Sequence, residues 1–300
     1  MKNNQTKGIL ILSLTAVIWG ITFIFQKMAV ASLGCFSFNA IRFAMGAIVI
    51  APFAIAGHIR DEKKQANKES NHKTVISGIL LGIIFCIASN LQQYAFKYTS
   101  TGKIAFITAL YMFFVPIIGY IFLKKKVSKI TWLCAALGFI GRYLLCINKE
   151  DKLSFGIGEA LALGCAIFFA IQILMIERFS AYINGVKLSF IEMTTGAVLS
   201  GVMMLILENP TMQSISKAVP SLLYAGIMSC GVAYTLQIVG QKYTESTIAS
   251  IIMCTEAVFA ALAAAVVLKE IPTIFEILGS IIMFCAIVIS QIAEIKKDEI

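Results

Sequence analysis

Five charged side chains in or beside long apolar segments of the sequence are candidates for a special role: Lys27, Arg42, Arg142, Glu192 and Glu256. Glu159 and Glu276 lie close enough to segment ends to reach headgroup water. A charge at the centre of a membrane helix costs about 2.5 to 3.5 kcal/mol on insertion scales, so each of the five needs a partner, water or a binding role. The cations suit a carboxylate or another anion, whereas a deep acid suits an ammonium group or an exchangeable proton. These residue types therefore predict non-covalent binding and proton exchange.

Glu256 is the deepest of the five, because about 11 residues of its apolar segment precede it, which at 1.5 Å per residue reaches the bilayer centre. It is interpreted as a substrate contact or a titrating carboxylate, with an ion-paired structural acid as the alternative. With the amino terminus inside, Lys27, Arg42 and Arg142 all fall in the outer half of their spans, so they predict a cationic zone on the outer side of the membrane. Lys27 can also extend to the interface, Arg42 can serve a structural pair, and the segment of Arg142 can be a peripheral dimer helix. Glu192 is interpreted as interfacial.

Polar residues at helical spacing extend this pattern. One segment carries Thr15, Trp19, Thr22 and Gln26, and another carries Cys86, Asn90, Gln93 and Lys97. Such stripes predict a polar lumen between helices, with plain interhelical hydrogen bonding as the alternative. The predicted binding residues are Trp19, Thr22, Lys27, Arg42, Asn90, Gln93, Tyr94, Tyr111, Gln172, Tyr234, Gln237 and Glu256.

The composition places these residues in a membrane. The chain has 300 residues, of which 59% are hydrophobic and 14% charged, and its mean hydropathy is +0.86. A soluble protein of this length could not cover so much apolar surface. A membrane helix needs about 20 apolar residues. Ten segments supply them: 8–26, 36–57, 74–96, 104–123, 130–147, 155–176, 188–207, 218–241, 246–268 and 273–293.

Lys and Arg in the connecting loops predict the orientation of these spans. With the amino terminus in the cytoplasm, most of the cations fall in cytoplasmic loops, as the positive-inside rule requires. Both termini are then cytoplasmic, and topology accounts for the net charge of +9 without a nucleic-acid partner. The first segment resembles a signal peptide, but its length favours a retained span.

An internal repeat divides the chain. Leu91–Thr99 (LQQYAFKYT) matches Leu236–Thr244 (LQIVGQKYT) at five of nine positions, an offset of 145 residues. Ala16, Ile21, Gly46 and Ala47 match Ala166, Ile171, Gly196 and Ala197 at an offset of 150. Each half, 1–150 and 151–300, is predicted to hold five spans. Because five is odd, the second copy enters the membrane upside-down, and inverted repeats are typical of transporters.

Several motifs in this order resemble the EamA family of the drug/metabolite transporter superfamily. They are WGITF at Trp19–Phe23, Lys27, Arg42-Phe43, the turn Lys97–Ser100, Pro116, and TEAVFAALAAAVVLKE at Thr255–Glu270. The chain departs from the family pattern at Lys124–Lys126 and at Ala257. The resemblance implies a ten-helix carrier of metabolites, amino acids or toxic compounds in the inner (plasma) membrane.

Together these features predict an all-α integral membrane protein that moves small metabolites, amino acids or related amines by alternating access, with export preferred. Proton coupling and a homodimer are further expectations. A passive facilitator or channel is the alternative, and a membrane enzyme a distant third: His58 and His72 lie in a charged loop, and no P-loop or nucleophile motif is present. The eight Cys lack metal-ligand spacing, so neither metal nor cofactor is expected.

Overall fold

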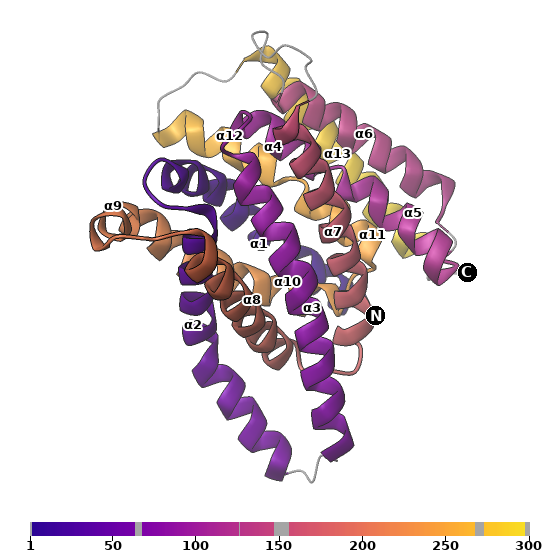
Figure 1. Cartoon of the computed structure of the whole chain (residues 1–300). Coiled ribbons are helices and arrows are strands. Elements are labelled where there is room, and N and C mark those ends of the chain that lie inside the picture. Colours follow the sequence, from indigo (N-terminus) through magenta and orange to yellow (C-terminus); the bar gives the residue numbers. More distant parts are fainter. Residues whose placement is uncertain (1, 64–67, 126, 147–155, 268–272, 298–300) are drawn as a thin grey trace.

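The computed structural model describes residues 2–63, 68–125, 127–146, 156–267 and 273–297, and every regular element in these ranges is helical (Figure 1). The first half contains α1 (Lys2–Val30), α2 (Cys35–Lys63), α3 (Lys68–Ala95), α4 (Thr101–Thr108), α5 (Tyr111–Leu123) and α6 (Lys129–Cys146). The second contains α7 (Ile157–Ser180), α8 (Gly185–Leu207), α9 (Met212–Leu223), η1 (Tyr224–Ala233), α10 (Tyr234–Gln241), α11 (Ser246–Met253), α12 (Glu256–Val267) and α13 (Ile274–Lys297). The predicted all-α fold is confirmed.

Seven helical segments of the described chain are long and apolar enough to cross a membrane: Gln5–Val30, Cys35–Gly57, His72–Ala95, Thr101–Leu123, Ile157–Ser180, Gly185–Leu207 and Met212–Gln241. They correspond to seven of the ten predicted spans. The other three predicted spans fall on α6, on α11 with α12, and on α13. Those segments are helical, and their crossing of the membrane stays a prediction. Residues 268–272, which include the end of the Thr255–Glu270 motif, lie outside the described ranges.

The outward-facing surface of the helices is apolar. Phe53, Phe122 and Leu205 are 68%, 76% and 78% exposed, and many further large hydrophobic side chains are exposed with them. In contrast, a set of polar side chains that includes Thr15, Gln93 and Arg142 is fully buried. This distribution, with polar groups inside and apolar groups outside, is what a lipid surrounding favours.

Two of the predicted spans are interrupted at the same place in the repeat. Ala109 and Leu110 separate α4 from α5, and Cys254 and Thr255 separate α11 from α12. The two interruptions are 145 residues apart, which is the offset of the sequence repeat. Each of these two predicted spans is therefore a pair of half-helices that meet inside the protein.

The packing of the halves follows a reciprocal pattern. Helix α3 packs against α7 and α8, while its repeat counterpart, η1 with α10, packs against α1 and α2. Counterparts also pack directly against each other, α2 against α8 and α6 against α13. Figure 1 shows α6 and α13 side by side, away from the splayed ends of α2 and α3.

A ten-residue π-helix, η1, stands in the middle of the segment Met212–Gln241. Small residues bring it against α2, since a side chain at Gly226 would meet Met45 and a side chain at Gly46 would meet Cys230. Small residues at helix interfaces allow such close approach in membranes. π-Helical turns are frequent at functional sites, and η1 contributes Ser229 to the cavity described next.

Candidate functional site

A cavity lies inside the bundle, between half-helices and spans from both repeats. Ten elements line it, α1, α2, α3, α4, α5, α7, η1, α10, α11 and α12. Its water-accessible volume is about 40 Å³, room for roughly three water molecules. The lining residues are Trp19, Thr22, Phe23, Gln26, Arg42, Gln92, Thr108, Tyr111, Phe169, Gln172, Ile173, Ser229, Tyr234, Gln237, Met253 and Glu256.

The cavity brings together most of the residues that the sequence singled out. Those in its wall are Trp19, Thr22, Arg42, Tyr111, Gln172, Tyr234, Gln237 and Glu256. Four others, Lys27, Asn90, Gln93 and Tyr94, do not line it. Because the eight lining residues come from α1, α2, α5, α7, α10 and α12, the wall depends on the packing of both halves.

Arg42 supplies a cation to this wall. Its side chain is only 2% exposed, and its Nε donates a hydrogen bond of 2.8 Å to Asn39 Oδ1. The guanidinium carbon lies 4.9 Å from the ring centre of Phe43 and 5.2 Å from that of Phe38. No acid among the described residues lies within ion-pair distance of Arg42. A buried guanidinium held by an amide and two rings retains donors for an anionic ligand.

Asn90 acts behind Arg42 without lining the cavity. Asn39 Nδ2 donates to Asn90 Oδ1 at 2.9 Å, and Asn90 Nδ2 donates to Ser200 Oγ at 3.0 Å. These contacts connect α2, α3 and α8 and fix the amide that accepts from Arg42. Asn90 is thus placed to orient the guanidinium.

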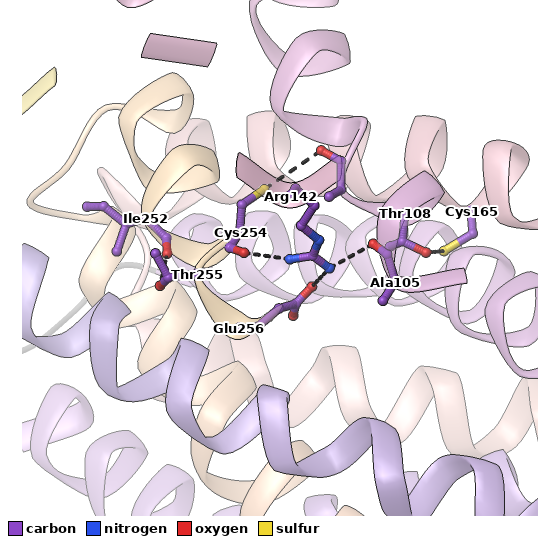
Figure 2. A network of polar contacts seen from close by, with 9 residues as sticks. Ala105, Thr108, Arg142, Cys165, Ile252, Cys254, Thr255 and Glu256 are labelled. Atoms are coloured by element: carbon purple, nitrogen blue, oxygen red, sulfur yellow. Dashed lines mark hydrogen bonds and ion pairs between the residues drawn. The ribbon is translucent and has the colours of Figure 1, made fainter. Parts of the chain in front are cut away.

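Glu256 forms an ion pair across the cavity's edge (Figure 2). Arg142 Nη2 donates to Glu256 Oε1 at 3.1 Å, and the two side chains are 0% and 6% exposed. Glu256 lies in the first turn of α12 and lines the cavity. The acid therefore lines the cavity and pairs with a cation at the same time. The ion pair agrees with the structural alternative, and a substrate contact or proton exchange stays a prediction.

Arg142 also binds the ends of two half-helices, as Figure 2 shows. Its Nη1 donates to the Cys254 carbonyl oxygen at 2.5 Å, and its Nη2 donates to the Ala105 carbonyl oxygen at 2.7 Å. These carbonyls belong to the carboxyl ends of α11 and α4, where a helix carries partial negative charge. Arg142, for which the sequence left a peripheral dimer helix open as an alternative, is buried and contacts α4, α11 and α12.

Glu192 differs from the sequence expectation, because it is fully buried rather than interfacial. Gln172 Nε2 donates to Glu192 Oε1 at 2.6 Å, which joins α7 to α8. Gln172 lines the cavity, so this acid stands directly behind the wall. A single sequence gives depth along a helix, but it does not show which neighbour covers that face.

Aromatic rings form another part of the wall. The rings of Trp19 and Tyr234 are 4.8 Å apart, and Phe85 meets Tyr234 edge-on at 4.7 Å. The buried Nε1 of Trp19 has no hydrogen-bond partner among the described groups. An indole N–H is a donor only, so Trp19 is left able to bind an acceptor in the cavity.

The other three residues outside the cavity form contacts elsewhere. Lys27 is exposed, and its Nζ donates to the Phe96 carbonyl oxygen at 3.1 Å, just beyond the end of α3. Gln93 is buried and exchanges two hydrogen bonds of 3.2 Å with Gln26. Tyr94 is half-buried and packs with neighbouring aromatic rings. Lys27, Arg42 and Arg142, which were predicted to form one cationic zone, thus each contact different residues.

Gln92 and Ser229 line the cavity although they stand off the polar stripes. Gln92 was detectable, because the 145-residue offset places it on Gln237, one of the predicted binding residues. Ser229 lies in η1, where the wider turn of a π-helix shifts the side chains out of the 3.6-residue register. Periodicity alone therefore could not find it.

Comparison with known proteins agrees with this architecture. The model of the EamA-like transporter family matches residues 6–147 and, a second time, residues 156–291. The chain belongs to the EamA-like transporter family. An uncharacterized transporter of Archaeoglobus fulgidus is 30% identical over 278 residues, which cover 93% of this chain and 83% of the relative.

Further relatives of this EamA protein are named in the same way. The uncharacterized transporter YoaV of Bacillus subtilis is 24% identical over 92% of this chain and 94% of its own length, and one from Clostridium kluyveri is 25% identical over 93% of each. A solved crystal structure shares the fold with a TM-score of 0.77 at 15% identity and covers 96% of this chain and 97% of the other.

Proposed function

We propose that this EamA protein is a secondary transporter that moves a small metabolite, an amino acid or a related amine, across the cytoplasmic membrane by alternating access. The observation that carries the proposal is Arg42, a buried cation that lines a central cavity and has no acidic partner among the described residues. An anionic group on the cargo would supply the missing charge. Export is the preferred direction.

The size of the cavity supports alternating access over a continuously open pore. A water-accessible volume of about 40 Å³ is too small for an amino acid, since ligand pockets usually enclose about 300 to 1,000 Å³. Helices around Arg42 must therefore separate before cargo enters. A passive facilitator would use the same residues, and uncoupled flux in both directions would identify it.

Two inverted five-helix units, 1–150 and 151–300, would provide this movement. The coincident helix interruptions and the reciprocal packing of α3 and of η1 with α10 support a pseudo-twofold relationship. We further propose that both termini are cytoplasmic and that the carrier can form a homodimer. The names of the family and of its relatives, all transporters, support a carrier rather than an enzyme.

Proton coupling through Glu256 is a further part of the proposal. The charged and titratable groups that face this acid are Arg142 from α6, Tyr111 from α5 and Cys165 from α7. Since Arg142 already neutralises Glu256, coupling requires that the ion pair opens during the cycle. Its test is given in the Discussion.

Uptake into proteoliposomes, measured with a panel of amino acids and amines, tests the function. We expect Arg42→Ala to raise the apparent KM by about tenfold or more, the effect of losing about 1.4 kcal/mol of binding. Arg42→Lys should retain part of the affinity, and Arg178→Ala, which changes an exposed arginine, should leave KM unchanged. A folded Arg42→Ala protein with wild-type kinetics would remove Arg42 from the site.

A further inference from the structure

Glu192 is a buried acid that the proposed transport cycle does not yet use. It is 0% exposed, and its Oε2 has no hydrogen-bond partner among the described groups. No Lys or Arg of the described chain lies within ion-pair distance of it. Among the described residues its hydrogen-bond partner is the Gln172 amide, which donates from Nε2 to Oε1 at 2.6 Å. Burial of a carboxyl group with so few hydrogen-bond partners costs free energy, so we expect Glu192 to serve a function.

The bond to Glu192 determines how Gln172 meets the cavity. In the structure the Gln172 side chain turns its NH₂ group to Glu192, and an ionised Glu192, which has no hydrogen to donate, can hold the side chain only in this orientation. The amide oxygen of Gln172, Oε1, is then buried without a hydrogen-bond partner among the described groups, and Gln172 lines the cavity. Gln237 lines the same cavity, and its Oε1 is likewise buried without a partner. Two side chains of the wall thus carry carbonyl oxygens that have no donor among the described groups.

The repeat sets this acceptor opposite a cation. Glu192 occupies the position in α8 that Arg42 occupies in α2, at the 150-residue offset, and these two helices pack against each other. Cys230 and Tyr234 lie close enough to interact electrostatically with both Arg42 and Glu192. The first half of the chain therefore places the cation of Arg42 in the cavity wall. The second half places there the amide of Gln172, which Glu192 holds.

We propose that Glu192 is a positioning residue that fixes Gln172 as a hydrogen-bond acceptor and so selects cargo that carries an ammonium group as well as an anionic group. This inference rests on the proposed transport function and deepens it. The anionic group of the cargo binds Arg42, while its ammonium group binds the carbonyl of Gln172. Glu192 itself acts through Gln172 and need not touch the cargo.

The test compares amino acids with their deaminated analogues. Leucine is paired with 4-methylpentanoate, and phenylalanine with 3-phenylpropanoate, so that each pair differs by the amine alone. Thermal-shift titration of the purified, detergent-solubilised protein gives a Kd for every compound. The ratio of the two Kd values within a pair measures the preference for the amine and is insensitive to a general change in stability.

Wild-type protein should favour the amino acid of each pair by about tenfold, equivalent to about 1.4 kcal/mol. In Glu192→Gln the ratio should fall towards one, because an amide at 192 holds Gln172 equally well in either orientation. Gln172→Met, which keeps the length of the side chain but removes the carbonyl, should lower the ratio in the same way. Glu192→Asp should restore part of it.

Glu159→Gln is the matched control, because Glu159 is also a buried acid at a helix of the second half, bonded to Thr99 and outside the cavity lining. Its ratio should equal that of the wild type. A folded Glu192→Gln or Gln172→Met protein that keeps the wild-type ratio overturns the positioning role. Wild-type protein that binds both members of each pair equally well also overturns it while leaving the transport function intact. Wild-type protein that binds none of the four compounds overturns the positioning role as well, and the transport function falls with it only if the proteoliposome panel also shows no uptake.

Discussion

The Cys254 thiol donates to the Ala109 carbonyl oxygen across 3.7 Å, and the two residues are 145 positions apart. That separation equals the offset of the sequence repeat, so a residue touches its own counterpart at the point where both spans are interrupted. Counterparts meet in this way when a twofold axis passes between them. The contact supports a pseudo-twofold axis through the two helix interruptions, beside the cavity and within reach of Arg142.

Removing Arg142 should destabilise the protein more than any exposed charge does. Arg142→Met leaves Glu256 buried without its cation and removes the guanidinium that bonds the carbonyls at the ends of α4 and α11. Loss of one partner of a buried ion pair costs about 3 to 5 kcal/mol. Thermal unfolding of the purified protein in detergent measures the effect, with Arg178→Met as the exposed control.

A second substitution separates the ion pair from the helix ends. Adding Glu256→Gln to Arg142→Met removes the uncompensated charge, so the double variant should regain part of the lost stability. If the double variant is no more stable than Arg142→Met alone, then Arg142 acts through the carbonyls of Ala105 and Cys254 and the pair contributes little.

Much of this arrangement could be read from the sequence because it depends on local pattern. Apolar runs located the helices, and the matched segments Leu91–Thr99 and Leu236–Thr244 located the repeat. Eight predicted binding residues share one cavity because polar stripes on membrane helices tend to face inward.

The remaining features depend on contacts between distant residues, which a single sequence does not contain. Arg142 and Glu256 are 114 residues apart, and no local signal pairs them. The interruptions at Ala109 and Cys254 were equally hidden, since Pro116 is the residue that local rules would choose to bend this span. The sequence predicted an interfacial Glu192 because it gives the position of this residue along the helix, but not the neighbours that cover its side chain.

Labelling from the two sides of the membrane should show the inversion directly. Ser32, in the turn after α1, and Tyr182, in the turn after α7, are repeat counterparts at the 150-residue offset. In a background with Cys146 and Cys285 replaced by Ser, we expect Ser32→Cys to react with a membrane-impermeant maleimide from outside whole cells. Tyr182→Cys should react only after the membrane is opened. Reaction of both from the same side would contradict the inverted repeat.

Glu177 should control movement rather than stability. It accepts from Lys125 Nζ at 2.5 Å and from the backbone N–H and hydroxyl of Ser246, which ties the α5–α6 linker and α7 to the start of α11. The pair is partly exposed, at 30% and 25%, so its worth to stability should be below about 1 kcal/mol. We expect Glu177→Gln to change the maximal transport rate several-fold with little change in Tm. Glu245→Gln, the adjacent acid, is the control.

Glu256→Gln decides whether this acid couples transport to protons. The amide keeps the size of the side chain and still accepts a hydrogen bond from Arg142, but it cannot exchange a proton. We expect a folded protein whose uptake no longer responds to an imposed pH gradient, measured in proteoliposomes at several gradients of both signs. Uptake at zero gradient should persist, because Arg42 and the rest of the cavity wall are unchanged. A pH response equal to that of the wild type would exclude Glu256 from coupling, and it would leave the Arg142–Glu256 pair as a purely structural bond between α6 and α12.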